Sequence, residues 1–497
     1  MVSDKFRRQL RQEANLWRTE GLIDAQLYEQ LSERYQFNSL ETAARDRFVM
    51  ILLGLGSILI GLGTISFVAA NWQELPRNGK VTLLLSLFIG VNTAGFYLWR
   101  RPNGAQQRLG HGFLLLGAII LGANMGLMGQ MFHISSSFYE LLLAWGVGVL
   151  AMAYSLRLTS LSVLAIIIIG LGYWSFWWNW EGASWSNSYY YEEFSWSSQM
   201  GQHMPLLASL MFVPLAYWCR SRVIFGLGAI AVISSLEANL RPLSLGLFNL
   251  FSLKSTGLVL AIALALPPAL LWGYDDSLWV YSDLNRVPKP NHQIPPAASW
   301  QGGSWGGSFR PLARRLALVF LGVVLYLSSS LWFWGVLFKM SSAEQSARVT
   351  WFPLVDVLIL SGLAIFAWLR LVWLSRSPRT RREEILTTIA IGVFICFMAG
   401  IPVWHLTVQP IPLLATFIGN VLLFLLAAGL MREGLAQAER SAFWGGMMLL
   451  ILRILTWFVL SATGLVFKSL LFILCGVTAI AIGLWFERYV RTLEIKN

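Results

Sequence analysis

The sequence predicts an all-α protein, a polytopic transmembrane helical bundle of about 14 helices with a small amino-terminal cytosolic helical hairpin. Three observations lead to this fold class. Hydrophobic residues make up 56% of the 497 residues and charged residues only 12%, whereas soluble domains have about 45–50% apolar and about 25% charged residues. The apolar residues form runs of about 20, the length of one bilayer crossing. Lys and Arg cluster between these runs.

The predicted spans follow from taking about 20 apolar residues per crossing. They are 48–70, 80–99, 110–131, 138–156, 159–178, 204–219, 222–240, 254–273, 313–337, 352–374, 384–405, 411–431, 442–461 and 466–486. The runs near 204–219 and 242–253 are the weakest, so a count of about 12 to 15 stays open.

The distribution of the 37 Lys and Arg residues predicts the orientation. Most of them fall in loops on the same side as the amino terminus, and the side rich in Lys and Arg is cytosolic in membrane proteins. We therefore expect a multi-pass protein of the cell membrane, the bacterial inner membrane, with both termini cytoplasmic. The net charge of +12 is then explained by topology, so the expected partner is the lipid bilayer and not nucleic acid.

Residues 1–47 are predicted to form a cytosolic amphipathic helical hairpin. Two short helices fit the pattern over 4–36, where Gly21 ends the first and the Asp24 side chain caps the second. One face of the first helix carries Phe6, Leu10, Ala14 and Trp17. The segment is too long and too charged for a cleavable signal peptide. It is either a handle of the membrane domain or a docking module for a cytosolic protein partner.

Two local motifs carry a family resemblance. One is Leu-Trp-Arg-Thr-Glu-Gly-Leu-Ile-Asp at 16–24, followed by Glu33-Arg34-Tyr35, and the other is Ala69-Ala70-Asn71-Trp72 with Pro76. Together they resemble the bacterial family catalogued as domain of unknown function 2157, a set of predicted membrane proteins. The resemblance covers about the first 100 to 200 residues, and 453–488 looks like the end of the long members. It implies a membrane location and supplies no catalytic residue, cofactor or substrate.

Glycine patterns predict where helices pack closely. In the first span, Gly54 and Gly61 lie on one helical face and Gly56 and Gly63 lie nearly opposite. Small residues let helix backbones approach, so this span is predicted to lie at the centre of the bundle. A GxxxG unit, Gly122 with Gly126, predicts close packing of the span 110–131.

Two stretches interrupt the pattern of spans. Residues 274–312 contain several prolines and the run Gly302-Gly303-Ser304-Trp305-Gly306-Gly307, which predicts a flexible cytosolic linker rich in Pro, Gly and Trp. This linker separates the first eight helices, 48–273, from the last six, 313–497. Residues 173–203 are rich in Trp and Tyr and lack Lys and Arg. They fit an outer interfacial belt or a stacking platform for sugars or lipid headgroups.

Arg453 is the clearest polar residue inside a predicted span. A charge near the bilayer centre costs about 2.5–3.5 kcal/mol on insertion scales, so it usually faces a partner or a wet cavity. Asp356, Glu237 and Glu140 lie at comparable predicted depth, and Asp356 is the expected partner because it belongs to the same six-helix half. The pair would either fix helix packing or serve to grip an anionic substrate or relay charge.

A second group of polar residues approaches the predicted outer surface, and we expect it to line a common outward-facing cavity that binds a ligand. Its members are Asn71, Trp72, Asn124, Gln130, His133, Glu140, Trp404 and His405. The five histidines have no HxxxH or HExxH spacing and the three cysteines have no CxxC spacing. We expect no metal, no cofactor and no catalytic residue, because the hydrolase, Walker and Rossmann motifs are also missing.

Three classes of function remain open. A transporter or flippase for a small or lipid-linked solute fits best. The sequence has many spans and polar residues at membrane depth, and prolines lie within the predicted helices at Pro214, Pro267 and Pro402. A non-catalytic scaffold, assembly factor or sensor that docks a partner through the amino-terminal hairpin is the alternative. A membrane-embedded enzyme acting on lipid-linked substrates is the third, and whether the protein is an enzyme is left undecided.

Overall fold

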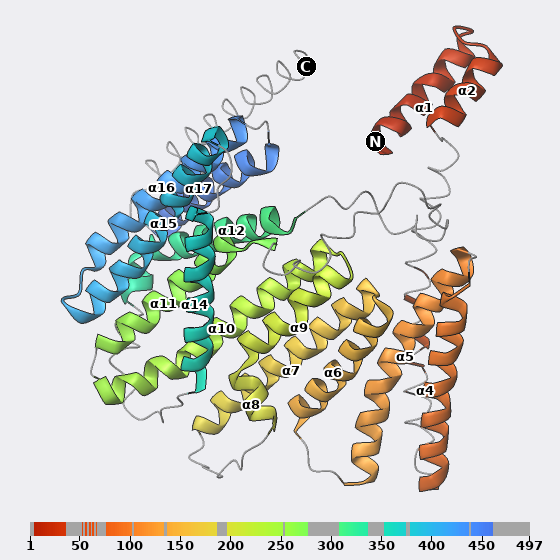
Figure 1. The fold of residues 1–497 in the computed structure, drawn as a ribbon, viewed down its shortest axis with the longest axis horizontal. Helices are drawn as coiled ribbons and strands as arrows, with labels where there is room; N and C mark the ends of the chain where they lie inside the picture. The colour runs from red at the N-terminus through yellow and green to blue at the C-terminus, as the bar shows by residue number, and fades with distance from the viewer. Residues whose placement is uncertain are drawn as a thin grey trace. The chain divides into compact units, whose positions relative to one another are not determined.

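The computed structural model describes 4–35, scattered positions in 52–66, 76–101, 104–133, 137–185, 196–251, 254–276, 308–335, 352–373, 378–436 and 439–460. All regular secondary structure in these residues is helical (Figure 1). Ten of the described helices are long and apolar enough to cross a membrane, and Met204–Trp218 and Gly257–Gly273 are shorter apolar helices. The predicted span 466–486 and most of 48–70 lie outside the described residues, so the count of 14 stays a prediction.

The described helices follow one another along the chain in numerical order. Their bounds are α1 Asp4–Thr19, α2 Ala25–Tyr35, α4 Arg77–Trp99, α5 Gly104–Met131, α6 Phe138–Leu156, α7 Thr159–Trp185, α8 Trp196–Gln202, α9 Met204–Trp218, α10 Arg222–Phe251, α11 Lys254–Gly273, α12 Arg310–Ser328, α14 Phe352–Trp373, α15 Pro378–Thr407, α16 Pro412–Ala436 and α17 Arg440–Leu460.

The chain forms two compact units. The first unit is Met1–Phe176 with Ile294–Gln301, and the second unit is Trp177–Gln293 with Gly302–Asn497. Within the second unit, α11 precedes the linker and packs against α12, α14 and α15, which follow it (Figure 1). One apolar core therefore unites helices from both predicted halves. Residues 277–307 of the linker lie outside the described part of the chain.

In the first unit, α1 and α2 pack on each other across a tight turn. Gly21 has a φ of +73°, a left-handed conformation that glycine adopts without steric cost. The Leu27 backbone N–H donates to Asp24 Oδ1 at 2.7 Å, so this side chain caps α2. Ala14, on the predicted apolar face of α1, is buried. The cytosolic location of these helices stays a prediction.

The packing of α5 depends on its glycines. A Cβ on Gly122 would lie 2.4 Å from Cδ2 of Trp145 in α6, and the Trp145 indole N–H donates to Ala118 O at 2.7 Å. A Cβ on Gly126 would make an ordinary 3.6 Å contact with Leu141. The face of α5 that carries the GxxxG unit therefore packs on α6, as the motif predicts.

For the described glycines of the first predicted span, the structure gives no evidence of close helix packing. Gly54 and Gly61 lie outside the described residues. A Cβ placed on Gly56 or Gly63 would meet no described atom within 4 Å. The central position of this span stays a prediction.

The predicted continuous span 313–337 is wrong, because the helix is interrupted in its second half. In the structure α12 ends at Ser328, with Ser329 as its C-cap, and helix resumes at 331–335. Ser329 Oγ donates to Tyr326 O at 2.7 Å and Ser330 Oγ donates to Leu327 O at 2.7 Å. Serine hydroxyls that bond backward to the backbone compete with the helical ladder, which favours a helix end here.

The start of α12 is fixed by an acid from the other end of the linker. Asp276 accepts hydrogen bonds from the Phe309 N–H at 3.0 Å and from the Arg310 N–H at 3.3 Å. A carboxylate at a helix amino terminus satisfies free N–H groups and complements the helix dipole. The Tyr217 hydroxyl donates to the same carboxylate at 2.5 Å, and burial raises the pKa of the adjacent Tyr274 phenol above its ordinary value.

Candidate functional site

Arg453 of α17 reaches across to the place where α12 is interrupted. Its Nε–H donates to Asn420 Oδ1 at 2.7 Å, and its Nη2 donates to the backbone oxygen of Ser329 at 2.6 Å. Asn420, on α16, donates through Nδ2 to the same Ser329 oxygen at 2.9 Å. Two side chains from two helices therefore hold one carbonyl group at the end of a third helix.

The neighbouring carbonyl is satisfied in the same way. The Trp334 indole N–H donates to Ser328 O at 2.7 Å, and Trp334 is fully buried. The last carbonyl groups of a helix have no partner within the helix, and hydrocarbon offers none. A cation near a helix carboxyl terminus also interacts favourably with the helix dipole. We call Ser328–Ser330 with Arg453, Asn420 and Trp334 the α12 break.

Gly419 allows α16 to approach the α12 break. A Cβ at this position would lie 2.8 Å from Ser328 O and 3.0 Å from its carbonyl carbon, closer than real Cβ atoms approach. Asn420 follows directly in the sequence, so the close approach at Gly419 sets the reach of the amide to Ser329. The glycine is thus required by the geometry of the site.

The predicted pairing of Arg453 with Asp356 is wrong. Arg453 lies on α17, which packs against α16 and α12, whereas Asp356 lies on α14, which packs against α9, α10 and α11. Within the described part of the chain, Arg453 is held by neutral oxygen acceptors and forms no ion pair. The partners of Arg453 depend on which helices lie next to α17, and the sequence does not show this.

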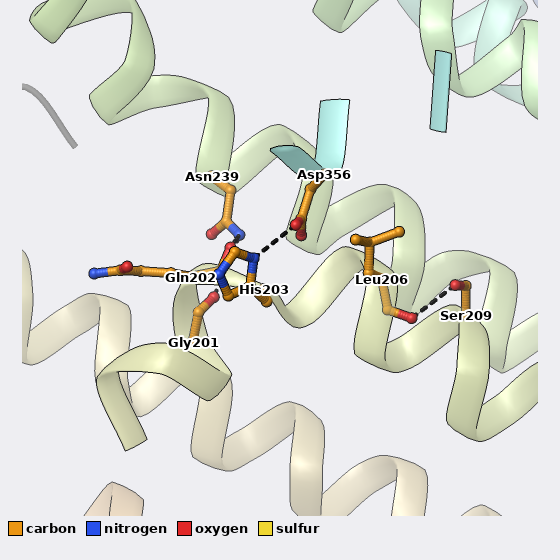
Figure 2. Close-up of polar contacts among 7 residues, drawn as sticks. All are labelled: Gly201, Gln202, His203, Leu206, Ser209, Asn239 and Asp356. Carbon is orange, nitrogen blue, oxygen red and sulfur yellow. Dashed lines mark hydrogen bonds and ion pairs between the residues drawn. The ribbon is translucent and has the colours of Figure 1, made fainter. Parts of the chain in front are cut away.

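Asp356 instead pairs with a histidine from another helix junction (Figure 2). His203 Nδ1 lies 2.7 Å from Asp356 Oδ1. The Asp356 side chain is only 1% exposed and the His203 side chain is 27% exposed. His203 is the residue between α8 and α9, and the carboxylate lies near the backbone N–H of Leu206 in the first turn of α9. We call these two residues the His203–Asp356 pair.

The junction that carries His203 is held by an amide from α10. Asn239 Nδ2 donates to Gln202 O at 2.6 Å and to Gly201 O at 3.3 Å, as Figure 2 shows. Asn239 is 3% exposed. These bonds satisfy the carbonyl end of α8 and fix the backbone on which His203 stands.

The predicted outward-facing group is divided in the structure. Asn124 is 4% exposed and its amide donates to Leu84 O of α4 at 3.0 Å, which is a helix-packing contact. Gln130 and His133 are exposed. Glu140 accepts a hydrogen bond from the Ser137 N–H at 3.0 Å at the start of α6, a capping role.

The remaining members of that group lie outside the described residues or in the second unit. Asn71 and Trp72 lie outside the described residues, as do 186–195 of the Trp-rich loop. Trp404 is exposed, and His405 is buried beside Trp334 with 5.3 Å between ring centroids, in the second unit. A common cavity for the group therefore stays a prediction. Across the described residues, no three or more His, Cys, Asp or Glu side chains are placed to hold a metal ion.

Sequence reasoning singled out Arg453 and Asp356 but missed the residues that contact them. Asn420 lies near the middle of its span and Ser329 follows another serine, and both are polar at the predicted depth of Arg453. His203 precedes a span that begins on the same predicted side as the span of Asp356. Matching depth across all spans would have drawn attention to these residues, but it does not tell which helices are neighbours.

Comparison with known proteins agrees with the membrane architecture. Residues 15–162 match the family described as predicted membrane protein, DUF2157. The resemblance to this family is confirmed for that stretch. The match and the apolar helices together identify a multi-pass transmembrane protein containing a domain of unknown function.

One curated protein with a named role is also similar over a short stretch. It is the probable 4-amino-4-deoxy-L-arabinose-phosphoundecaprenol flippase subunit ArnE of Klebsiella pneumoniae (strain 342). The two sequences are 25% identical over 96 residues, which is 19% of this chain and 85% of the relative. No solved structure matches the chain.

Proposed function

We propose that the protein is transporter- or flippase-like and moves a small or lipid-linked solute across the membrane. The observation that carries the proposal is the α12 break. Here α12, which is long enough to cross the membrane by itself, ends, and its last carbonyl groups accept hydrogen bonds from Arg453, Asn420 and Trp334. Non-helical backbone at membrane depth is tolerated where it is buried in protein or lines a water-filled cavity. Interrupted helices form the substrate sites of many transporters.

The charge at the α12 break favours a solute with an anionic group. A guanidinium has five N–H donors, and Arg453 uses its Nε and Nη2 groups to contact Asn420 and Ser329. The other donors form no hydrogen bond with a described residue. An intramembrane cation that is half-buried and paired only with neutral oxygens is a functional-site candidate by default. A phosphate or carboxylate of the solute would supply the missing negative charge.

The comparison with the ArnE protein supports the lipid-linked class of solute. That relative is named as a flippase subunit for a phosphoundecaprenol derivative, a lipid with an anionic phosphate. The likeness covers about a fifth of this chain. It supports movement of a lipid-linked solute as the first activity to test.

The proposal includes a placement in the bacterial inner membrane with both termini cytoplasmic. This orientation rests on the excess of Lys and Arg in loops on one side. It would place Arg453 slightly beyond the midplane toward the outer surface. The His203–Asp356 pair would lie near the outer ends of its helices.

The test is lipid movement by the purified full-length protein in liposomes. The probe is a polyprenyl phosphate with a fluorophore that dithionite quenches only in the outer leaflet. We expect the wild type to expose the inner-leaflet label to quenching, Arg453→Gln to slow this exposure, and Arg432→Gln, an exposed matched control, to behave as wild type. Wild-type vesicles that protect the label as well as protein-free vesicles would contradict the proposal.

A second candidate function is suggested by the surface of α1 and α2. Leu16, Leu22 and Leu27 are exposed on this helix pair, as in a surface that docks a protein partner. The protein would then be a scaffold, assembly factor or sensor. Removal of residues 1–38 discriminates between the candidates, because a docking function would be lost and lipid movement in liposomes would continue.

A further inference from the structure

We infer that the His203–Asp356 pair is a proton-binding site that couples solute movement to the proton gradient. This inference rests on the proposed transport function and adds the coupling ion to it. Its basis is a titratable pair, one residue from the α8–α9 junction and one from α14, with 2.7 Å between Nδ1 and Oδ1, beside an apolar cluster of the second unit. Acidic and histidine side chains in membrane spans often form proton relays.

The surroundings of the pair are built from apolar side chains. Members of the buried cluster around Asp356 come from α10, α11 and α14, and Leu206 and Leu354 pack against it. They are Leu236, Leu240, Val259, Ala263, Leu266, Val357, Leu360 and Ala364. Both oxygens of Asp356 are inaccessible to solvent or bonded to His203. The Asp356 carboxylate therefore lies in a medium that penalises its charge.

Few other titratable groups belong to the helices that pack against the pair. On α10 there is Glu237, a half-buried residue two positions before Asn239. The described side chains of α11 that face α14 are apolar. At the junction of α8 and α9, the carbonyl groups of Gly201 and Gln202, which precede His203, accept hydrogen bonds from the neutral Asn239 amide. His203 and Asp356 are the two titratable groups in direct contact here.

The number of protons decides the net charge of the pair. With one exchangeable proton it is neutral, either as carboxylate and imidazolium or as carboxylic acid and neutral imidazole. Without that proton its net charge is −1. The neutral form passes through apolar surroundings at much lower cost than the charged form. A change of helix positions that exposes the pair first to one side and then to the other would therefore carry the proton with it.

The pair also links the helices that would have to move. His203 precedes α9, Asp356 lies in the first turns of α14, and α9 contains Pro214 in its interior. Proline removes a helical hydrogen bond and allows a kink. Because α14 packs against α9, α10 and α11, protonation of the pair affects a contact shared by several spans.

The experiment uses the full-length protein in liposomes with the fluorescent polyprenyl phosphate and a clamped membrane potential. If one proton accompanies each probe molecule, a gradient of about one pH unit distributes the probe about tenfold unequally between the leaflets. We expect this asymmetry in the wild type and its loss on addition of a protonophore. Asp356→Asn and His203→Gln are expected to distribute the probe equally. Glu439→Gln, which removes an acid from the ion pair with Arg315, is the matched control and keeps the asymmetry.

The outcomes separate the coupling site from the transport function. A wild type that equilibrates the probe but shows no asymmetry under the pH gradient would overturn the coupling inference and leave transport standing. Asymmetry driven by a sodium gradient would overturn the choice of ion. A wild type that moves no probe without a gradient would contradict the transport function and, with it, this inference. Thermal unfolding of both pair variants checks that they fold, and if one fails the other carries the test.

Discussion

The α12 break and the His203–Asp356 pair are both polar sites within the spans of the second unit, but they hold charge differently. At the α12 break one permanently charged group, Arg453, is bonded to neutral oxygens of Asn420 and Ser329. In the pair, two titratable groups face each other at 2.7 Å. The first site contains one fixed positive group, whereas the second, in the proposed coupling, gains and loses one proton.

This difference indicates how the two sites divide the work of a transporter. A constant positive charge suits the binding of an anionic group, because the attraction does not depend on pH. A pair of variable charge suits coupling to the proton gradient. The sites also differ in structural cost, since the α12 break needs an interrupted helix and a close approach at Gly419, whereas the pair needs only two helix starts to lie together.

The largest effect on stability is expected at the α12 break, from Gly419→Leu. Even a Cβ at Gly419 would lie 2.8 Å from Ser328 O, so a larger side chain must push α16 away from the α12 break. Overpacking of this kind costs about 3 kcal/mol. We expect a clearly lower thermal unfolding midpoint in detergent, measured by tryptophan fluorescence. Gly429→Leu on the same helix is the control, because a Cβ there meets nothing within 4 Å, and equal midpoints for the two variants would contradict the description of the site.

An intermediate effect is expected from Arg453→Lys. Lysine keeps the charge but has a single ammonium group, which cannot reproduce the planar fork that reaches Asn420 Oδ1 and Ser329 O together. The loss of one hydrogen bond lowers the free energy of unfolding by about 1 kcal/mol. The exposed Arg432→Lys is the control. If both lysine variants unfold like the wild type, charge alone and not the fork stabilises the α12 break.

The smallest effect on stability is expected in the first unit, from the loss of a buried hydrogen bond between uncharged groups. Asn124→Ala removes the hydrogen bond from the amide to Leu84 O, and such bonds between membrane helices contribute about 0.6 kcal/mol. We expect a small decrease in thermal stability and no change in the response of transport to pH. The exposed Gln130→Ala serves as the control. A pH-dependent effect of Asn124→Ala would show that the first unit also takes part in coupling.

Much of the fold was predictable because a bilayer imposes a simple length rule. Apolar runs identified the described spans, and the GxxxG unit at Gly122 and Gly126 identified a packed face of α5. The interruption at Ser328–Ser330 was not predictable, because serine is tolerated in spans and its bonds to the backbone are local.

The candidate site was predictable only in part, because its residues come from helices far apart in the sequence. Arg453 was singled out by its charge, but its partners depend on α16 and α12 being the neighbours of α17. Asp356 was singled out for the same reason and was assigned the wrong partner. His203 gave only the signal of a histidine near a helix end, which is common in proteins. The spatial order of spans decides such pairings, and a single sequence does not encode it in any local pattern.

The central claim is that the α12 break lies on a water-accessible path, and cysteine accessibility tests it most directly. In a background in which Cys219, Cys396 and Cys475 are replaced by serine, Ser330→Cys is treated with a hydrophilic, membrane-impermeant thiol reagent. Val323→Cys, on the exposed face of the same α12 helix, is the control that faces lipid. We predict that the cysteine at 330 reacts and that the one at 323 does not. A cysteine at 330 as unreactive as the control would contradict the claim and favour a packed, dry scaffold.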